Sequence, residues 1–86
     1  MRPPERIDEI LSLFKKTWKQ SPDLRFMQLM YAMQSDYSER NNRVGRIEAT
    51  EADGLLRVGY DLFHLEDDQF LDFLKNRLEE NEERKG

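Results

Sequence analysis

The sequence predicts a mainly α-helical fold, a three-helix bundle with an irregular segment between the second and third helices. Apolar residues recur at helical spacing in three separate stretches, with prolines or carboxylates near the start of each, and this periodicity is lost between residues 38 and 60. The 86 residues allow one domain at most. We place that domain at residues 1–78 and a solvated, charged tail at residues 79–86.

The first helix is expected over about residues 4–19. Pro3 and Pro4 suit a first turn, where the missing N–H is not needed, and lysines follow at the other end, where they complement the helix dipole. The residues of one helical stripe are Ile7, Ile10, Leu11, Phe14 and Trp18.

The second helix is expected over about residues 22–37. Ser21, Pro22 and Asp23 are typical of a helix start, and only Gln20 then separates the second helix from the first. Two neighbouring stripes of this helix are apolar. A helix that is apolar over so much of its circumference is either central to the fold or partly covered by another chain.

Residues 38–60 show turn chemistry without a clear period. Leu55, Leu56 and Val58 need a place to bury. A short helical turn, a small two-stranded β element and a mobile loop all fit, and we favour irregular structure with one short element. The third helix is expected over about residues 67–80, because carboxylates precede an apolar stripe that ends before Glu79.

Composition argues against several functions. The absence of cysteine excludes thiolate metal sites and cysteine nucleophiles, and a single histidine excludes any multi-histidine site. His64 stands beside Glu66, Asp67 and Asp68, but consecutive residues at a helix start point in different directions. No Gly-x-Ser-x-Gly or phosphate-binding loop is present. We therefore expect no catalysis, no metal and no cofactor. We also expect neither a membrane span nor a signal peptide, and hence a cytoplasmic protein.

Two motifs carry a family resemblance. One is Trp18-x-x-Ser-Pro-Asp-Leu-Arg-Phe-x-Gln-Leu29, and the other is Asp61-Leu-Phe-x-x-Glu-Asp-Asp-x-Phe-Leu-x-x-Leu74. Together they resemble a group of small, uncharacterised bacterial and phage-associated proteins. In that group an aromatic residue is expected where this chain has His64. The resemblance covers two short windows, leaves residues 38–60 unmatched and implies a small, mainly helical fold without a known activity.

The favoured function is a non-catalytic protein-binding module whose partner is another protein or a second copy of the chain. Its contact surface is predicted on the second helix and residues 38–60, since methionines and aromatics are common at recognition surfaces. The alternative is nucleic-acid binding through a loop of arginines, which the net charge of −4 disfavours. The candidate contact residues are Phe26, Met27, Met30, Tyr31, Arg40, Arg43 and Arg46.

Overall fold

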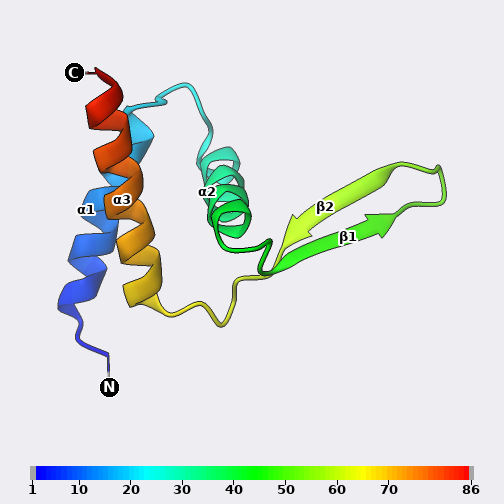
Figure 1. Ribbon diagram of the computed structural model, residues 1–86, viewed down its shortest axis with the longest axis horizontal. Coiled ribbons are helices and arrows are strands. Elements are labelled where there is room, and N and C mark those ends of the chain that lie inside the picture. The colour runs from blue at the N-terminus through cyan, green and yellow to red at the C-terminus, as the bar shows by residue number, and fades with distance from the viewer. Residues whose placement is uncertain (1, 86) are drawn as a thin grey trace. The chain divides into compact units, whose positions relative to one another are not determined.

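The structure is a computed structural model that describes the backbone of residues 2–85 and the side chains of residues 2–82. Within these residues the chain forms three helices, α1 (Glu5–Lys19), α2 (Phe26–Arg40) and α3 (Asp67–Lys85). Two strands, β1 (Arg46–Thr50) and β2 (Leu56–Tyr60), pair antiparallel between α2 and α3 (Figure 1). The mainly α-helical class with a short β element in this position is therefore confirmed.

The chain divides into two compact units. The first, here called the helical unit, comprises Met1–Arg25 and Leu65–Gly86 and contains α1 and α3. The second, the hairpin unit, is Phe26–His64 and contains α2 and both strands. The buried apolar side chains are Leu29, Met33 and Tyr37 on α2, and Leu71, Phe73, Leu74 and Leu78 on α3.

In the helical unit α1 and α3 lie side by side and run in the same direction (Figure 1). Arg2, just before α1, donates to Glu66, just before α3, with Nε–Oε2 and Nη2–Oε1 distances of 2.9 and 2.7 Å. At the other end Asn81 Nδ2 donates to Gln20 Oε1 over 2.8 Å. Polar pairs at both ends therefore fix the parallel alignment of the two helices.

The second helix begins later than predicted, at Phe26 instead of residue 22. Ser21 and Pro22 occupy the first two positions of a β-turn, which Leu24 N closes by donating to Ser21 O over 3.1 Å. The carbonyl of Leu24 accepts from Trp18 Nε1 over 2.9 Å. This contact holds Leu24 against the end of α1, so the residues expected to start a helix form a connecting turn instead.

The second helix also ends later than predicted, at Arg40 instead of residue 37. Asn41 Nδ2 then donates to Tyr37 O over 2.8 Å and satisfies one of the carbonyls that a helix end leaves free. Asn42 and Arg43 follow with φ angles of 60° and 61°, and Gly45 with 73°. This left-handed backbone turns the chain sharply from α2 into β1.

The hairpin pairs Arg46 with Tyr60 at its base and Thr50 with Leu56 near its tip. Glu51 N donates to Leu55 O, and Gly54 N donates to Glu51 O, each over 2.9 Å. A three-residue loop with glycine at φ 84° therefore closes the hairpin.

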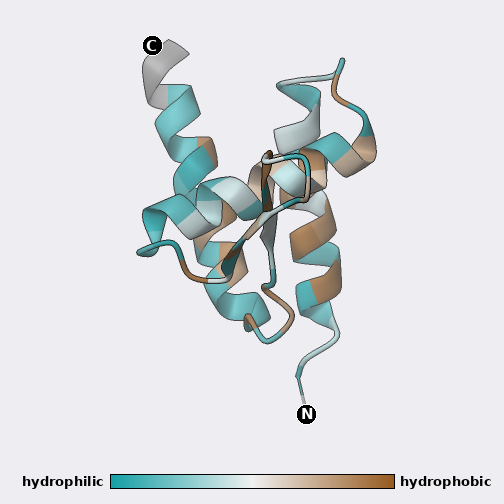
Figure 2. Ribbon diagram, turned by 90° about the vertical axis from the view of Figure 1, so that its right-hand side faces the viewer, coloured by the Kyte–Doolittle hydropathy of each residue, from teal (hydrophilic) through white to brown (hydrophobic). Residues whose placement is uncertain are grey.

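The third helix starts at Asp67 as predicted but continues to Lys85, so residues 79–85 are helical and do not form the predicted tail. The stretch after Leu78 has no apolar stripe, and much of the end of α3 is hydrophilic (Figure 2). Its glutamates are good helix formers, and the bond from Asn81 to Gln20 ties this part of α3 to the end of α1. Helix formation here therefore does not need an apolar seam.

Candidate functional site

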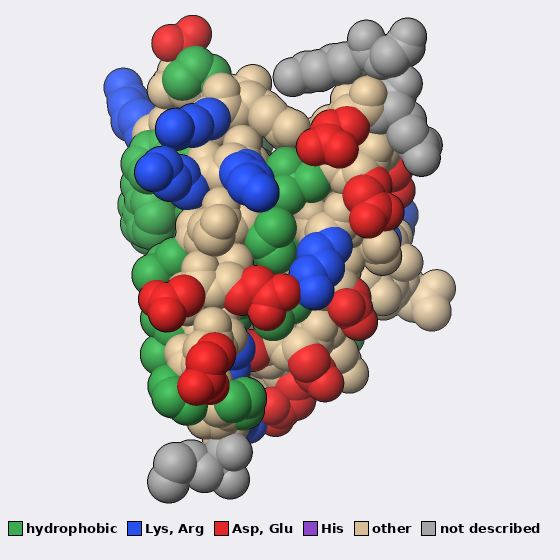
Figure 3. Space-filling model, turned by 90° about the vertical axis from the view of Figure 1, so that its left-hand side faces the viewer, with side chains coloured by type: hydrophobic (Ala, Val, Ile, Leu, Met, Phe, Trp, Pro, Cys, Tyr) green, Lys and Arg blue, Asp and Glu red, His purple; other side chains and the backbone are tan. Residues whose placement is uncertain are grey.

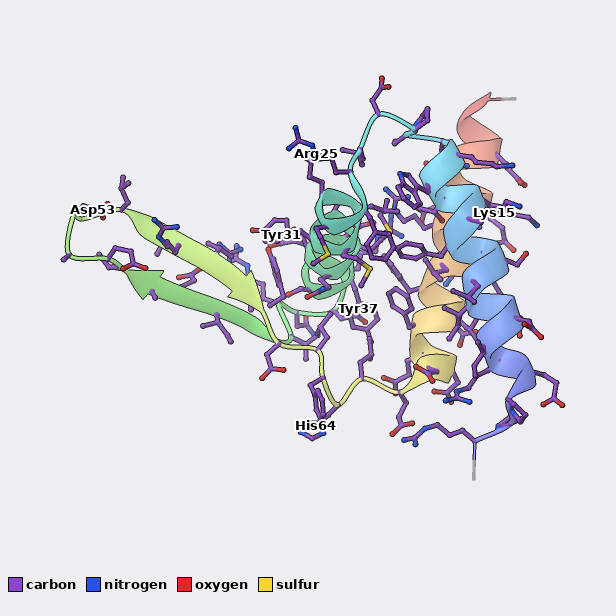
Figure 4. The ribbon with its side chains drawn as sticks, turned by 180° about the vertical axis from the view of Figure 1, so that it is seen from behind. Lys15, Arg25, Tyr31, Tyr37, Asp53 and His64 are labelled. Carbon is purple, nitrogen blue, oxygen red and sulfur yellow. The ribbon has the colours of Figure 1, made fainter. Side chains whose placement is uncertain are left out.

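The predicted contact residues of α2 differ in accessibility. Met27 is 73% exposed, and Phe26 and Tyr31 are about half exposed, whereas Met30 is half-buried. Tyr31 extends from α2 toward the hairpin, as the side-chain view shows (Figure 4). Three of the four predicted apolar residues of this helix are thus accessible to a partner.

Two tyrosines attach the hairpin to α2. Tyr31 Oη donates to Val58 O over 3.3 Å, and Tyr60 Oη donates to Ser35 Oγ over 3.1 Å. The two rings meet edge to face with centroids 5.4 Å apart. Tyr60 was not among the predicted site residues. Tyr60 follows Val58 by two residues, and this spacing indicates that both side chains lie on the same face of a strand.

The register shows which edge of the hairpin α2 covers. Backbone bonds at Glu51–Leu55 and at Gly45–Asp61 set the alternation, so the carbonyl of Val58 points away from β1, on the outer edge of β2. Tyr31 binds that carbonyl and so occupies part of the β2 edge. The residues of β1 after Arg46 are exposed along the rest of the strand.

Exposed apolar side chains concentrate in the hairpin unit. Of the ten large hydrophobic residues that are exposed among the described residues, eight lie between residues 26 and 64. We call these eight residues the hairpin-unit surface: Phe26, Met27, Tyr31, Val44, Ile47, Leu55, Leu56 and Phe63. The register places Ile47 and Leu56 on opposite faces of the hairpin, so these side chains are distributed over more than one face of the unit. Single exposed apolar residues are ordinary, but the described part of the helical unit exposes two large hydrophobic side chains against eight here.

The three predicted arginines all lie beside carboxylates of their own unit. Arg40 Nε is 3.1 Å from Asp36 Oδ1, and Arg43 Nε is 3.9 Å from Glu39 Oε2. Arg46 Nη1 is 3.0 Å from Glu39 Oε1. A phosphate would have to compete with these carboxylates, so the arginines do not form an open basic patch.

The acidic segment around His64 offers no converging ligand set. His64 is exposed and contacts Phe63 edge to face, with ring centroids 5.0 Å apart (Figure 4). Within the described part of the chain, no three histidine, aspartate or glutamate side chains are placed to hold a metal ion. Phe63 itself is 85% exposed.

A second polar cluster, which the sequence patterns did not reveal, lies where α1 and α3 begin. Arg6 Nε donates to Asp67 Oδ2 over 2.6 Å beside the Arg2–Glu66 pair, and a cavity of about 420 Å³ opens there. The hydrogen bond to Glu66, and then its negative charge, raises the pKa of Arg2. The arginines and carboxylates in this cluster pair with each other, and the pairs link the first turns of the two helices.

No helix among the described residues is long and apolar enough to cross a membrane. Searches against protein-family models, curated proteins and solved structures found no match to the chain.

Proposed function

We propose that the chain is a non-catalytic, cytoplasmic protein-binding module that contacts its partner through the hairpin-unit surface. The observation that carries this proposal is the concentration of eight exposed large hydrophobic side chains in residues 26–64. Burial of such side chains against a partner is favourable, at roughly 25 cal/mol per Å² of apolar area.

The hairpin favours a particular mode of contact. The exposed strand β1 has Ile47 and Ala49 on one face and polar residues on the other. An extended segment of a partner can add to such an edge through main-chain hydrogen bonds, while alternate side chains provide specificity. Leu55 and Leu56 near the hairpin tip, and Met27 on α2, expose further apolar area in the same unit.

The ion pairs of Arg40, Arg43 and Arg46 favour a protein partner over a nucleic acid. Nucleic-acid binding gains affinity when Lys and Arg side chains neutralise phosphates and so release the counterions condensed on the nucleic acid. Here each guanidinium lies beside a carboxylate, and the chain has a net charge of −4. The nucleic-acid alternative therefore becomes an outcome of the test below.

The test is affinity capture from lysate of the native cell with the intact chain and with a variant that carries Met27→Lys and Leu56→Lys. Both side chains are exposed, so the variant should fold with a free energy of unfolding within about 0.5–1 kcal/mol of the parent. A matched control carries Ser12→Lys and Asn76→Lys, at exposed polar positions of the helical unit, outside the proposed contact site. We expect the parent and the control to retain the same partner and the first variant to lose it.

Two outcomes would contradict the proposal. One is a partner that binds the Met27→Lys, Leu56→Lys variant as tightly as the parent. The other is a gel shift of duplex DNA or single-stranded RNA at low salt that disappears when Arg40, Arg43 and Arg46 are replaced by Ser. The second result would assign the hairpin unit to nucleic-acid binding.

A further inference from the structure

Helix α1 has an apolar edge that α3 leaves uncovered. Thr17 is buried and Ile10 and Leu13 are half-buried, whereas Ile7 is 48% and Leu11 is 62% exposed. Ile7 and Leu11 are four residues apart and so lie on one face of the helix. These two are the exposed large hydrophobic residues of the described part of the helical unit, and they form a stripe rather than a scatter.

The stripe continues with the spacing of a coiled-coil seam. Pro4, Ile7, Leu11, Phe14 and Trp18 are separated alternately by three and four residues, the period at which two helices pack knobs into holes. Phe14 and Trp18 are half-buried, so the seam borders the side of α1 that is already covered. A second helix would complete the coverage of α1.

The charges beside the seam fit a second copy of α1 in the antiparallel direction. Asp8 and Lys15 occupy equivalent flanking positions seven residues apart, and both are exposed. In an antiparallel pair the same flank of each helix meets, which places Asp8 of one copy near Lys15 of the other. In a parallel pair these two residues would instead face the flank that holds Ile10 and Thr17.

The same alignment matches a hollow on the surface. Lys15, Trp18, Lys19 and Pro22 line a cavity of about 290 Å³. If Leu11 lies opposite Phe14 of a second copy, Ile7 lies opposite Trp18 and its side chain reaches this hollow. The first turn of α1 is acidic and its last turn is basic, and the view toward α1 shows basic groups above and acidic groups below beside a column of hydrophobic side chains (Figure 3).

We propose that two copies of the chain associate through antiparallel α1 helices, centred on the seam of Ile7, Leu11, Phe14 and Trp18. The seam shares no residue with the hairpin-unit surface and lies in the other compact unit. A helix of 15 residues is about 22 Å long, so the contact lies at the small end of specific interfaces. The dimer is therefore reversible and concentration-dependent, and salt weakens its exposed ion pairs.

The first experiment is sedimentation equilibrium of the intact chain over a concentration series at low and high salt. We expect a monomer–dimer equilibrium for the parent and at least about a hundredfold weaker association for Leu11→Glu, because two glutamates would enter one apolar seam. Circular dichroism should be unchanged, since Leu11 is mostly exposed. A parent that stays monomeric up to about millimolar concentration would overturn the proposal.

Charge exchange tests the antiparallel alignment. Asp8→Lys alone and Lys15→Asp alone should each weaken self-association about tenfold, because like charges then meet twice. An equimolar mixture of these two variants should restore association, since every lysine then faces an aspartate. Lys16→Asp is the matched control, because Lys16 lies on the side of the helix away from the seam and the net charge changes equally.

The outcomes separate this proposal from the proposed function. Dimerisation that survives Leu11→Glu but disappears with Met27→Lys and Leu56→Lys would move self-association to the hairpin-unit surface and overturn the α1 dimer. A mixture of the charge variants that fails to associate would overturn the antiparallel alignment. If the Met27→Lys, Leu56→Lys variant loses the captured partner but still dimerises through α1, the result supports both proposals. If that variant still captures the partner, the result contradicts the proposed function alone.

Discussion

A methyl group added at Gly45 should destabilise the hairpin unit far more than one added at either of the other two internal glycines. Gly45 has a φ of 73°, and a Cβ there would lie 2.6 Å from Asp61 O and 2.7 Å from Leu62 Cδ2. The left-handed conformation costs a non-glycine residue about 1–2 kcal/mol. Relief of the clash must also displace the backbone bond from Asp61 N to Gly45 O, now 2.8 Å, at a further cost of about 1 kcal/mol. We therefore expect Gly45→Ala to lower the free energy of unfolding by about 2–3 kcal/mol.

The other two glycines serve as internal controls. Gly54 has a φ of 84° with open space around it, so Gly54→Ala should cost only about 1 kcal/mol. Gly59 has neither a positive φ nor a nearby atom, and Gly59→Ala should be neutral or stabilising by about 0.5 kcal/mol. The measurement is urea unfolding followed by tyrosine fluorescence and by hydrogen exchange of the hairpin amides. Equal destabilisation by Gly45→Ala and Gly54→Ala would refute the role assigned to the close approach of Asp61.

Three further predictions concern the helices. Leu74 is 0% exposed, so Leu74→Ala should lower the free energy of unfolding by about 2–5 kcal/mol in a urea titration. A loss below about 1 kcal/mol would show that the site collapses around the smaller side chain. The buried Ser38 hydroxyl has no hydrogen-bond partner among the described residues, so Ser38→Ala should leave the free energy of unfolding unchanged or raise it by up to about 1 kcal/mol. A clear drop in the melting temperature of the variant would show that the hydroxyl does have a partner. The hydrogen bond and the charge of Glu9 raise the pKa of Lys75, so the pair stabilises the fold at neutral pH and this contribution disappears as the pH rises through the raised pKa, above 10.5. The difference in melting temperature between the parent and Lys75→Met should therefore be largest at neutral pH and shrink as the pH rises through the raised pKa, and a difference that does not change with pH would contradict the assignment.

The existence of the three helices could be predicted because their apolar residues repeat with the helical period. The start of α2 could not be predicted in the same way, because Ser21 and Pro22 are favourable both at a helix start and in a β-turn. In the structure the Trp18 indole donates to the carbonyl of Leu24, on the far side of the turn. The end of α3 was missed for a similar reason, since its partner Gln20 is remote in the sequence.

The candidate site could be predicted in part. The exposed apolar residues of α2 followed from an apolar circumference too wide for its neighbours to cover, and Phe26, Met27 and Tyr31 are indeed accessible. The arginines were predicted as a local basic group, but their ion pairs with Asp36 and Glu39 depend on the helix and the turn that bring these side chains together. Charge along a sequence does not show which charges are already paired in space.

Helical periodicity, prolines and helix-end charges act between residues a few positions apart, and they were enough to predict the three helices. The pairing of β1 with β2, the parallel alignment of α1 with α3 and the exposed apolar edge of α1 depend on contacts between residues that are distant in the chain, and no local pattern predicts them. The periodicity of a helix shows how wide its apolar face is. How much of that face is covered depends on the size and direction of the neighbouring element, here the parallel helix α3 with its core residue Leu74.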